Sequence, residues 1–123
     1  TESTLQDALA RTASRTTGVQ VNFTVTGDSR ELPVTTSAEL VRITQSTLAN
    51  VTRHAQASRA DLTLTFLPDS VLLDIVDDGG GFDPASAGFG LTVLKDRVAA
   101  IGGKVTIESS AGAGTAVAVE VPS

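Results

Sequence analysis

The sequence Val-Asp-Asp-Gly-Gly-Gly-Phe-Asp-Pro-Ala-Ser-Ala-Gly-Phe-Gly-Leu, residues 76–91, decides how the chain is interpreted. An apolar run precedes it, and a helical pattern of apolar residues follows it. Its five glycines allow the backbone to take φ > 0 and to approach a ligand closely. A strand that ends in acids and glycines suits a nucleotide. The Asp77 carboxylate can accept a hydrogen bond from a base amino group, and N–H groups at the next helix start can hold phosphate oxygens. A solvated turn explains this stretch alone equally well.

Several common ligand motifs are absent from this stretch. No Gly-Lys-Ser/Thr ends the loop, so it is not a P-loop, and Gly-x-Gly-x-x-Gly does not occur. The spacing of Asp77, Asp78 and Asp83 does not fit an EF-hand calcium loop. The rest of the chain has to separate a nucleotide site from a turn.

Length and composition limit the class of protein. The 123 residues are enough for one domain, 1–123, and 41% of them are hydrophobic, which favours a packed core. No Cys is present, so disulfides, thiolate metal sites and a cysteine nucleophile are excluded. The net charge of −5 and the scattered basic residues argue against nucleic acid as the partner. No apolar run reaches the ~20 residues that span a bilayer, and no signal-peptide pattern is present.

The hydrophobic periodicity predicts three helices. The chain starts at Thr1 within the first helical pattern, which suggests a domain cut from a longer protein. Thr36 and Glu39 form a capping box, so the second helix is predicted to begin there and to run to about His54 or Ala55. Gly102-Gly103 is predicted to end the third helix as a C-cap. The predicted helices cover residues 1–17, 36–55 and 91–101.

Alternating or continuous apolar runs predict five strands. The alternation in the first of them suggests an antiparallel sheet with one covered face. A turn at 68–70 predicts that the strands on either side form a hairpin. The predicted fold class is α+β, a two-layer α/β sandwich with about five mixed, mostly antiparallel strands and three helices on one face. The predicted strands cover residues 19–25, 59–67, 71–76, 104–108 and 115–121.

The second helix carries an unusual polar row at steps of i, i+4, made of Arg42, Ser46, Asn50 and His54. An Asn within a helix does not favour helicity, so an Asn directed at a ligand is a reasonable interpretation. A neutral Asn oxygen suits Mg²⁺, which retains waters and phosphate oxygens as its other ligands. Arg53 and His54, at the same helix end, can pair with phosphate charge.

Taken together, these motifs resemble the ATP-binding catalytic domain of bacterial two-component sensor histidine kinases, in the superfamily of gyrase B, Hsp90 and MutL. The motifs are Asn50-x-x-Arg53-His54, Asp77-x-Gly79-x-Gly81-Phe82, Gly88-x-Gly90-Leu91 and Gly112-x-Gly114-Thr115. The run 40–55 is similar to the branch that phosphorylates LuxR-type response regulators. The fold implied is of the Bergerat type, and the implied cofactors are ATP and Mg²⁺.

The resemblance implies a role for each matching position. Asn50 would ligate Mg²⁺, with Arg53 and His54 near the phosphates. Asp77 would bond the adenine amino group, with Thr115 supporting it through water. Residues 82–89 would form a lid over ATP. The remaining ATP-binding positions implied are Gly79, Gly81, Phe82, Gly88, Phe89, Gly90 and Leu91; no catalytic side chain is assigned.

The chain departs from the family pattern at three positions. Ser46 stands where the superfamily's hydrolases carry a water-activating Glu, and a Ser is not a strong base at neutral pH, so efficient hydrolysis is not expected. Transfer to a histidine needs no such base. Gly80 replaces a commoner polar or basic residue, and Ala111 stands where Pro often precedes the glycine turn.

The resemblance implies a function in autophosphorylation. The domain would bind Mg·ATP and supply the γ-phosphoryl to a histidine on its own dimerisation domain, and then, through the full-length kinase, act on a response regulator. The isolated fragment would not autophosphorylate. The expected location is cytoplasmic, without membrane contact by this domain, whether or not the full-length kinase is anchored in a membrane. The alternatives are an anti-sigma-factor serine kinase and a degenerate, non-catalytic nucleotide-binding or interaction module.

Overall fold

Helices and strands alternate along the part of the chain that the computed structural model describes. That part comprises residues 5–54, 57–79, 91–109 and 114–123, with the backbone alone at 53, 54 and 91–93. The elements in order are α1 (Leu5–Arg15), β1 (Gln20–Gly27), α2 (Val34–His54), β2 (Arg59–Phe66), β3 (Ser70–Asp77), α3 (Leu91–Ala100), β4 (Lys104–Ser109) and β5 (Thr115–Pro122).

The strands form one sheet in the order β1-β2-β3-β5-β4. The pairs β2–β3, β3–β5 and β5–β4 are antiparallel, whereas β1 is parallel to β2. The predictions of a mixed, mostly antiparallel sheet and of a β2–β3 hairpin are therefore confirmed.

The alternation of the first strand suggested an antiparallel sheet with one covered face; the covered face is confirmed, but this strand itself is not antiparallel to its neighbour. β1 runs parallel to β2 because α2 connects them, and a helical crossover returns the chain to the same end of the sheet before the next strand begins. The alternation that suggested antiparallel pairing has another cause. β1 is an edge strand whose polar residues face solvent, while Val21, Phe23 and Val25 pack against the core.

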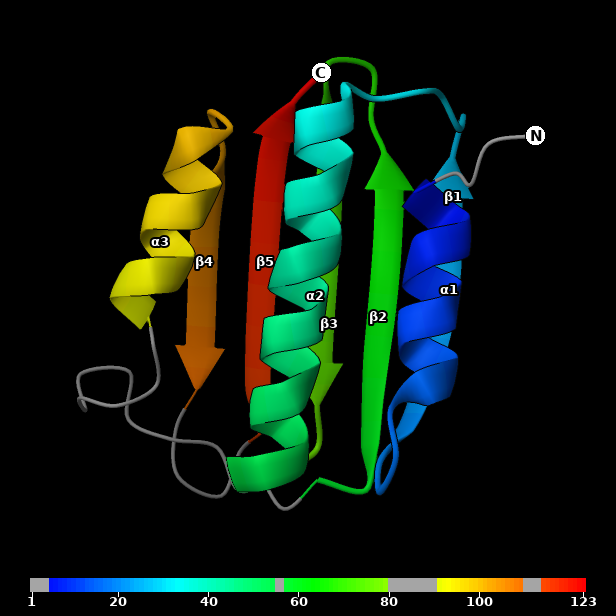
Figure 1. Ribbon diagram of the computed structural model, residues 1–123, viewed down its shortest axis with the longest axis vertical. Helices are drawn as coiled ribbons and strands as arrows, with labels where there is room; N and C mark the ends of the chain where they lie inside the picture. Colours follow the sequence, from blue (N-terminus) through cyan, green and yellow to red (C-terminus); the bar gives the residue numbers. More distant parts are fainter. Residues whose placement is uncertain (1–4, 55–56, 80–90, 110–113) are drawn as a thin grey trace.

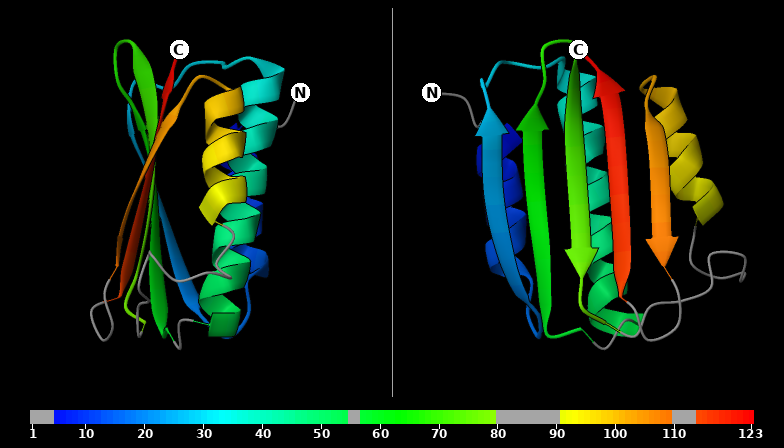
Figure 2. Two further views of the ribbon diagram at one scale, coloured as in Figure 1. Left: turned by 90° about the vertical axis from the view of Figure 1, so that its left-hand side faces the viewer. Right: turned by 180° about the vertical axis from the view of Figure 1, so that it is seen from behind.

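All three helices cover the same face of the sheet, so the fold is the predicted two-layer sandwich (Figures 1 and 2). The edge-on view in Figure 2 shows the helices on one side and the other face of the sheet uncovered. The core lies between the layers and is built of aliphatic side chains. Those no more than 2% exposed include Leu9, Leu40, Ile43, Leu48, Leu62, Leu64, Leu73, Ile75, Val98 and Val119.

Helix α2 begins at Val34, two residues before the position predicted from the capping box. The carbonyl of Pro33 accepts the first helical hydrogen bond, from the N–H of Ser37 at 3.0 Å. Thr36 is buried within the first turn, and Glu39 approaches Arg97 of α3 with 3.9 Å between Oε1 and Nε. The capping-box prediction is wrong because Thr36 lies inside the helix instead of before it, and Glu39 is directed towards α3.

The C-cap prediction for α3 is confirmed. Gly102 has φ +75°, its N–H bonds to the carbonyl of Ala99 at 2.9 Å, and the N–H of Gly103 bonds to that of Val98 at 2.9 Å. This pair of bonds is a Schellman motif, which ends a helix with a left-handed residue.

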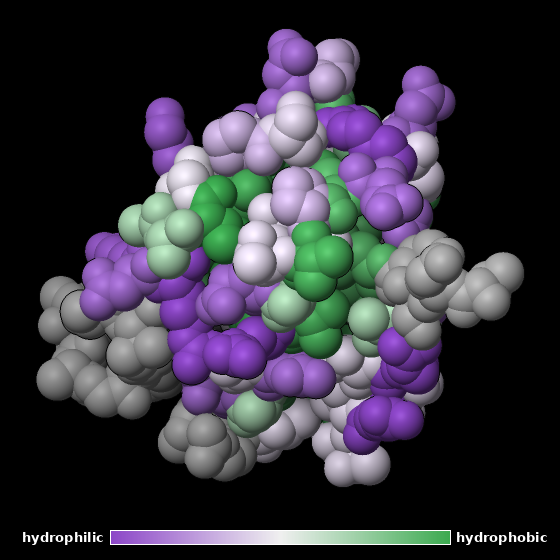
Figure 3. Space-filling model, turned by 45° about the horizontal axis from the view of Figure 1, so that its top comes forward, coloured by the Kyte–Doolittle hydropathy of each residue, from purple (hydrophilic) through white to green (hydrophobic). Residues whose placement is uncertain are grey.

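Apolar residues reach part of the surface that Figure 3 shows. In Figure 3, which brings the top of the molecule forward, hydrophobic residues gather in the middle of the view, with hydrophilic residues around them. Val41, Leu94 and Ile101 are partly buried and pack against the core. Among the described helices, none is both long and apolar enough to cross a bilayer.

One end of the sheet collects the residues on which the sequence prediction depends. α2, β3 and β4 end there, and β2 and β5 begin there (Figure 1). We call this the Asp77 end of the sheet, after the last residue of β3. The β2–β3 turn and the start of α2 lie at the opposite end.

Candidate functional site

Asp77 is a buried carboxylate in the middle of the sheet. Its strand, β3, is paired on both sides, and in register Asp77 lies between Ala60 of β2 and Thr115 of β5. Asp77 is only 7% exposed, and Thr115 is 8% exposed. Residues directly opposite each other on neighbouring strands point to the same face, so both side chains belong to the helix-covered side.

The carboxylate of Asp77 retains capacity to accept further hydrogen bonds. Its Oδ1 accepts the N–H of Gly79 at 2.8 Å. Burial raises its pKa, and the neighbouring charge of Asp78 raises it further, while bonds from the backbone N–H groups of Gly79 and Thr115 lower it. Two carboxylate oxygens offer about four acceptor positions. The site can therefore bind a ligand that carries N–H donors.

A row of polar side chains continues from Asp77 across the sheet. Ser109, the last residue of β4, is in register with Thr115, and their hydroxyl oxygens lie 2.9 Å apart. Ser109 Oγ also donates to the carbonyl of Gly114 at 3.0 Å. Ser109 is not among the residues that the sequence predicted for the site. A signal was present, since Ser109 is the polar member of an inward-facing series with Val105 and Ile107.

Gly114 allows β5 to approach β3 closely at this end. Its φ is +76°, and a Cβ built on it would lie 2.4 Å from the carbonyl oxygen of Asp77. A side chain here would both strain the backbone and push β5 away from β3. The close approach places Thr115 beside Asp77.

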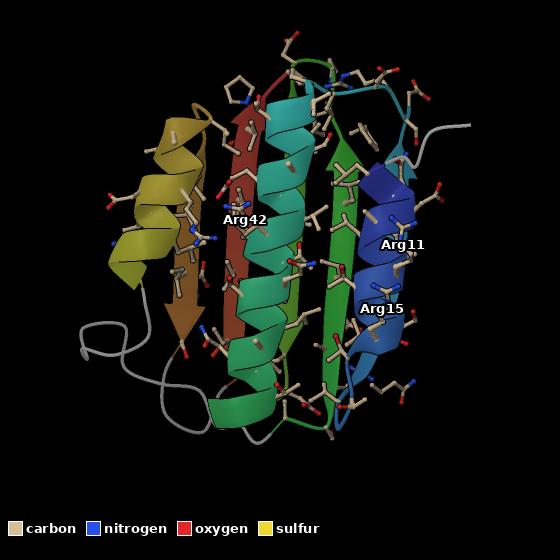
Figure 4. All side chains as sticks on the ribbon, viewed as in Figure 1. Arg11, Arg15 and Arg42 are labelled. Carbon is tan, nitrogen blue, oxygen red and sulfur yellow. The ribbon has the colours of Figure 1, made fainter. Side chains whose placement is uncertain are left out.

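Asn50 lies one turn before the end of α2, at the same end of the molecule as Asp77. Its side chain is half-buried, and none of the described residues hydrogen-bonds to it. The polar row that it belongs to begins at Arg42, which Figure 4 shows on the side of α2 towards α3, whereas Arg11 and Arg15 project from α1. Ser46 of the same row is exposed.

Part of the predicted site lies outside the described residues. Arg53 and His54 are in the last turn of α2, and Leu91 is the first residue of α3, but their side chains are not described. The remaining predicted positions outside the described residues are Gly81, Phe82, Gly88, Phe89 and Gly90, together with Gly80 and Ala111.

Asp78 has a structural role that the sequence analysis missed. Its carboxylate accepts the backbone N–H groups of Ser58 and Arg59, both at 2.9 Å, and the hydroxyl of Ser58 at 2.6 Å. Hydrogen bonds from Ser58 and Arg59 lower the pKa of Asp78 to about 2. The side chain thereby ties the start of β2, just after α2, to the end of β3.

Comparisons with known proteins show the family to which the chain belongs. Residues 35–123 match the family model "Histidine kinase-, DNA gyrase B-, and HSP90-like ATPase". The chain belongs to this ATPase family. The chain is therefore an ATP-binding domain, and the resemblance on which the sequence interpretation rests is confirmed.

Relatives in this ATPase family are sensor kinases. The chain is 38% identical over 103 residues to the sensor histidine kinase LnrJ of Bacillus subtilis, covering 84% of this chain and 26% of that protein. It is 39% identical over 97 residues to the signal transduction histidine-protein kinase/phosphatase UhpB of Salmonella typhimurium, covering 77% of this chain and 19% of that protein. The chain thus spans about a quarter or less of these two relatives.

A solved histidine kinase domain has the same fold. The domain from the blue-light activated histidine kinase EL346 of Erythrobacter litoralis superposes with a TM-score of 0.78 at 22% identity, covering 97% of this chain and 61% of that chain. The arrangement of three helices on a five-stranded sheet is therefore that of this ATPase family.

Substitution of Gly114 tests the close approach of β5 to β3. We expect Gly102→Ala to lose about 1–2 kcal/mol of unfolding free energy and Gly114→Ala to lose at least as much, because each places Ala at positive φ. Gly102 has open space around its Cβ position, whereas Gly114 meets Asp77. Gly114→Ala should therefore lose more unfolding free energy than Gly102→Ala, measured by urea unfolding. Gly114→Ala alone should also weaken ATP binding, measured by calorimetric titration. Equal losses in the two variants would contradict the close-contact role.

Substitution of Asp78 tests its role as a tie between β2 and β3. A lowered pKa means that the ionised form is favoured in the folded state. The stabilisation by ionised Asp78 is therefore fully present above pH 3.8, the pKa of this group in the unfolded chain, and is lost as pH falls through its folded pKa of about 2. We expect Asp78→Ala to lower the thermal midpoint at pH 7, with a difference from wild type that shrinks as pH falls below 4. Asp96→Ala, at an exposed position on α3, is the control and should change the midpoint little. A difference independent of pH would exclude the charged tie.

Proposed function

We propose that residues 1–123 form the Mg·ATP-binding catalytic domain of a two-component sensor kinase, which presents the γ-phosphoryl group to a histidine on the kinase's own dimerisation domain. The observation that carries this proposal is the buried Asp77 carboxylate, held by Gly79 and paired with Thr115 at the end of a central strand. The relatives named as sensor histidine kinases favour this function over a serine kinase or a non-catalytic module.

Asp77 and Thr115 would bind the adenine base. The amino group of adenine is neutral, and the buried carboxylate of Asp77 can accept a hydrogen bond from it. The N–H of Gly79 fixes one carboxylate oxygen, so the orientation of the other is set before the base arrives. Such preorganisation reduces the entropy lost on binding. Because Gly79 has no side chain, its backbone can lie close to the base beside Asp77.

Asn50 would bind Mg²⁺ through its amide oxygen. Among the described residues, no group of three or more His, Cys, Asp or Glu could hold a metal. A cation at this position would therefore depend on the Asn50 oxygen, waters and phosphate oxygens, which is a donor set that Mg²⁺ accepts. Arg53 and His54 would contact the phosphates, and Gly81, Phe82, Gly88, Phe89, Gly90 and Leu91 remain predicted ATP contacts.

The chemistry is supplied by ATP, whose terminal P–O bond breaks as a P–N bond forms to the acceptor histidine, with ADP as the leaving group. The residues of this chain would position the nucleotide and offset its charge. Ser46 is exposed and is not a base at neutral pH, so the chain offers no water-activating group at that position. The acceptor histidine, the dimerisation domain and a response regulator of the LuxR-type branch would be the partners, with the domain in the cytoplasm.

Asp77→Asn tests the assignment of the base site. The Asn can still accept the N–H of Gly79, but its NH₂ group would then face the amino group of adenine, donor against donor. An unpaired buried donor costs about 1–3 kcal/mol, so we expect Mg·ATP affinity to fall by about tenfold or more in calorimetric titration. Unchanged affinity would refute the assignment.

The same variant carries an internal control for folding. Since burial raises the pKa of Asp77, ionisation costs stability in the folded state. The stability of wild type relative to Asp77→Asn should therefore fall as pH rises from 3.8 through the raised pKa. Loss of affinity in a variant with this stability profile cannot be ascribed to unfolding.

Asn50→Ala tests the metal role. The ratio of ATP affinity measured with Mg²⁺ to ATP affinity measured with EDTA shows the effect of the metal. Removing the amide oxygen should reduce this ratio by about tenfold, because one ligand of the cation is lost. Ser46→Ala is the matched control, one turn earlier in the same helical row, and should leave that ratio unchanged. If Asn50→Ala retains the full effect of Mg²⁺, Asn50 is not a ligand.

A further inference from the structure

Two of the hydrogen-bond contacts of Ser109 together fix the direction in which the Thr115 hydroxyl donates its proton. Its Oγ lies 3.0 Å from the carbonyl oxygen of Gly114 and 2.9 Å from Oγ1 of Thr115. A hydroxyl has one proton to donate and two lone pairs to accept with. A carbonyl oxygen can only accept, so the proton of Ser109 is directed to Gly114.

The direction of the second bond follows from the first. With its proton used, Ser109 Oγ takes part in the contact with Thr115 as the acceptor, and Thr115 donates. Both contacts are satisfied only in this arrangement. Because Thr115 is 8% exposed, water does not readily replace Ser109 as the partner of that proton. The oxygen of Thr115 therefore has only lone pairs left for a ligand.

Asp77, on the neighbouring strand β3, can likewise only accept hydrogen bonds from a ligand. It lies directly opposite Thr115, and an ionised carboxylate is an acceptor only. The two side chains form a surface that offers acceptors and no side-chain donor. A ligand edge with N–H donors satisfies this surface, whereas a carbonyl oxygen at the same place would face acceptors and lose its partners.

We propose that Ser109 is a positioning residue: by accepting the proton of Thr115, it holds the Thr115 hydroxyl as an acceptor and so strengthens the selection of 6-amino over 6-oxo purines. This inference rests on the proposed base site. Ser109 does not touch the ligand itself and acts through Thr115. Without Ser109, the Thr115 hydroxyl is free to turn and to donate to a 6-oxo group.

The test measures the affinities of the full chain for Mg·ATP and Mg·ITP, which carry an amino and an oxo group at position 6. Wild type should prefer ATP. In Ser109→Ala, the ratio of the two dissociation constants should fall by about three- to tenfold, since one oriented hydrogen bond is lost. Ser109→Thr retains the hydroxyl and should retain the ratio. Ser109→Cys, whose thiol is a weak donor and acceptor, should lower it too and serves as the second variant should Ser109→Ala not fold.

A second arm separates action through Thr115 from a general structural effect. Thr115→Val should lower the preference for ATP, and adding Ser109→Ala to Thr115→Val should lower it no further. Equal weakening of both nucleotides in Ser109→Ala, or an unchanged ratio, overturns the role of Ser109 while leaving the base site in place. Absence of any preference in wild type overturns the proposed base recognition as well.

Discussion

The site depends on the pairing of β3 on both of its edges. Because β2 and β5 flank it along its whole length, the last residue of β3 is buried although it is an aspartate. Gly114 makes this possible, since a side chain there would meet the Asp77 carbonyl. The desolvation that raises the Asp77 pKa and the proximity of Thr115 both follow from this closed end of the sheet.

Two adjacent aspartates are used in opposite ways because successive residues of a strand point to opposite faces. Asp77 points to the covered side, where burial raises its pKa. Asp78 is exposed, and hydrogen bonds from Ser58 and Arg59 lower its pKa to about 2. The first carboxylate is the one proposed to bind the base, whereas the second fixes the chain just after α2. The tie of Asp78 therefore relates the helix that carries Asn50 to the strand that carries Asp77.

The long helix α2 spans the sheet from one end to the other. Its 21 residues extend about 30 Å, so its end reaches the Asp77 end while its start lies beside the β2–β3 turn. Its apolar stripe is anchored by Leu40, Ile43 and Leu48, which are almost fully buried. Packing along the whole helix thus holds Asn50 in place, so the polar row needs no contact of its own with the sheet.

The sequence by itself determined the element types, most element limits, the two-layer class and the two residues on which the proposed site rests, Asp77 and Asn50. These follow from local periodicity, from glycines that end elements and from motif spacing. The tertiary structure was needed to show that β1 is parallel to β2, that α2 starts at Val34 rather than at a capping box, and that Asp78 bonds to Ser58 while Ser109 contacts Thr115. Each of these depends on which strands or helices become neighbours. Pairing and register are fixed by hydrogen bonds and burial between segments distant in the sequence, which no local pattern encodes.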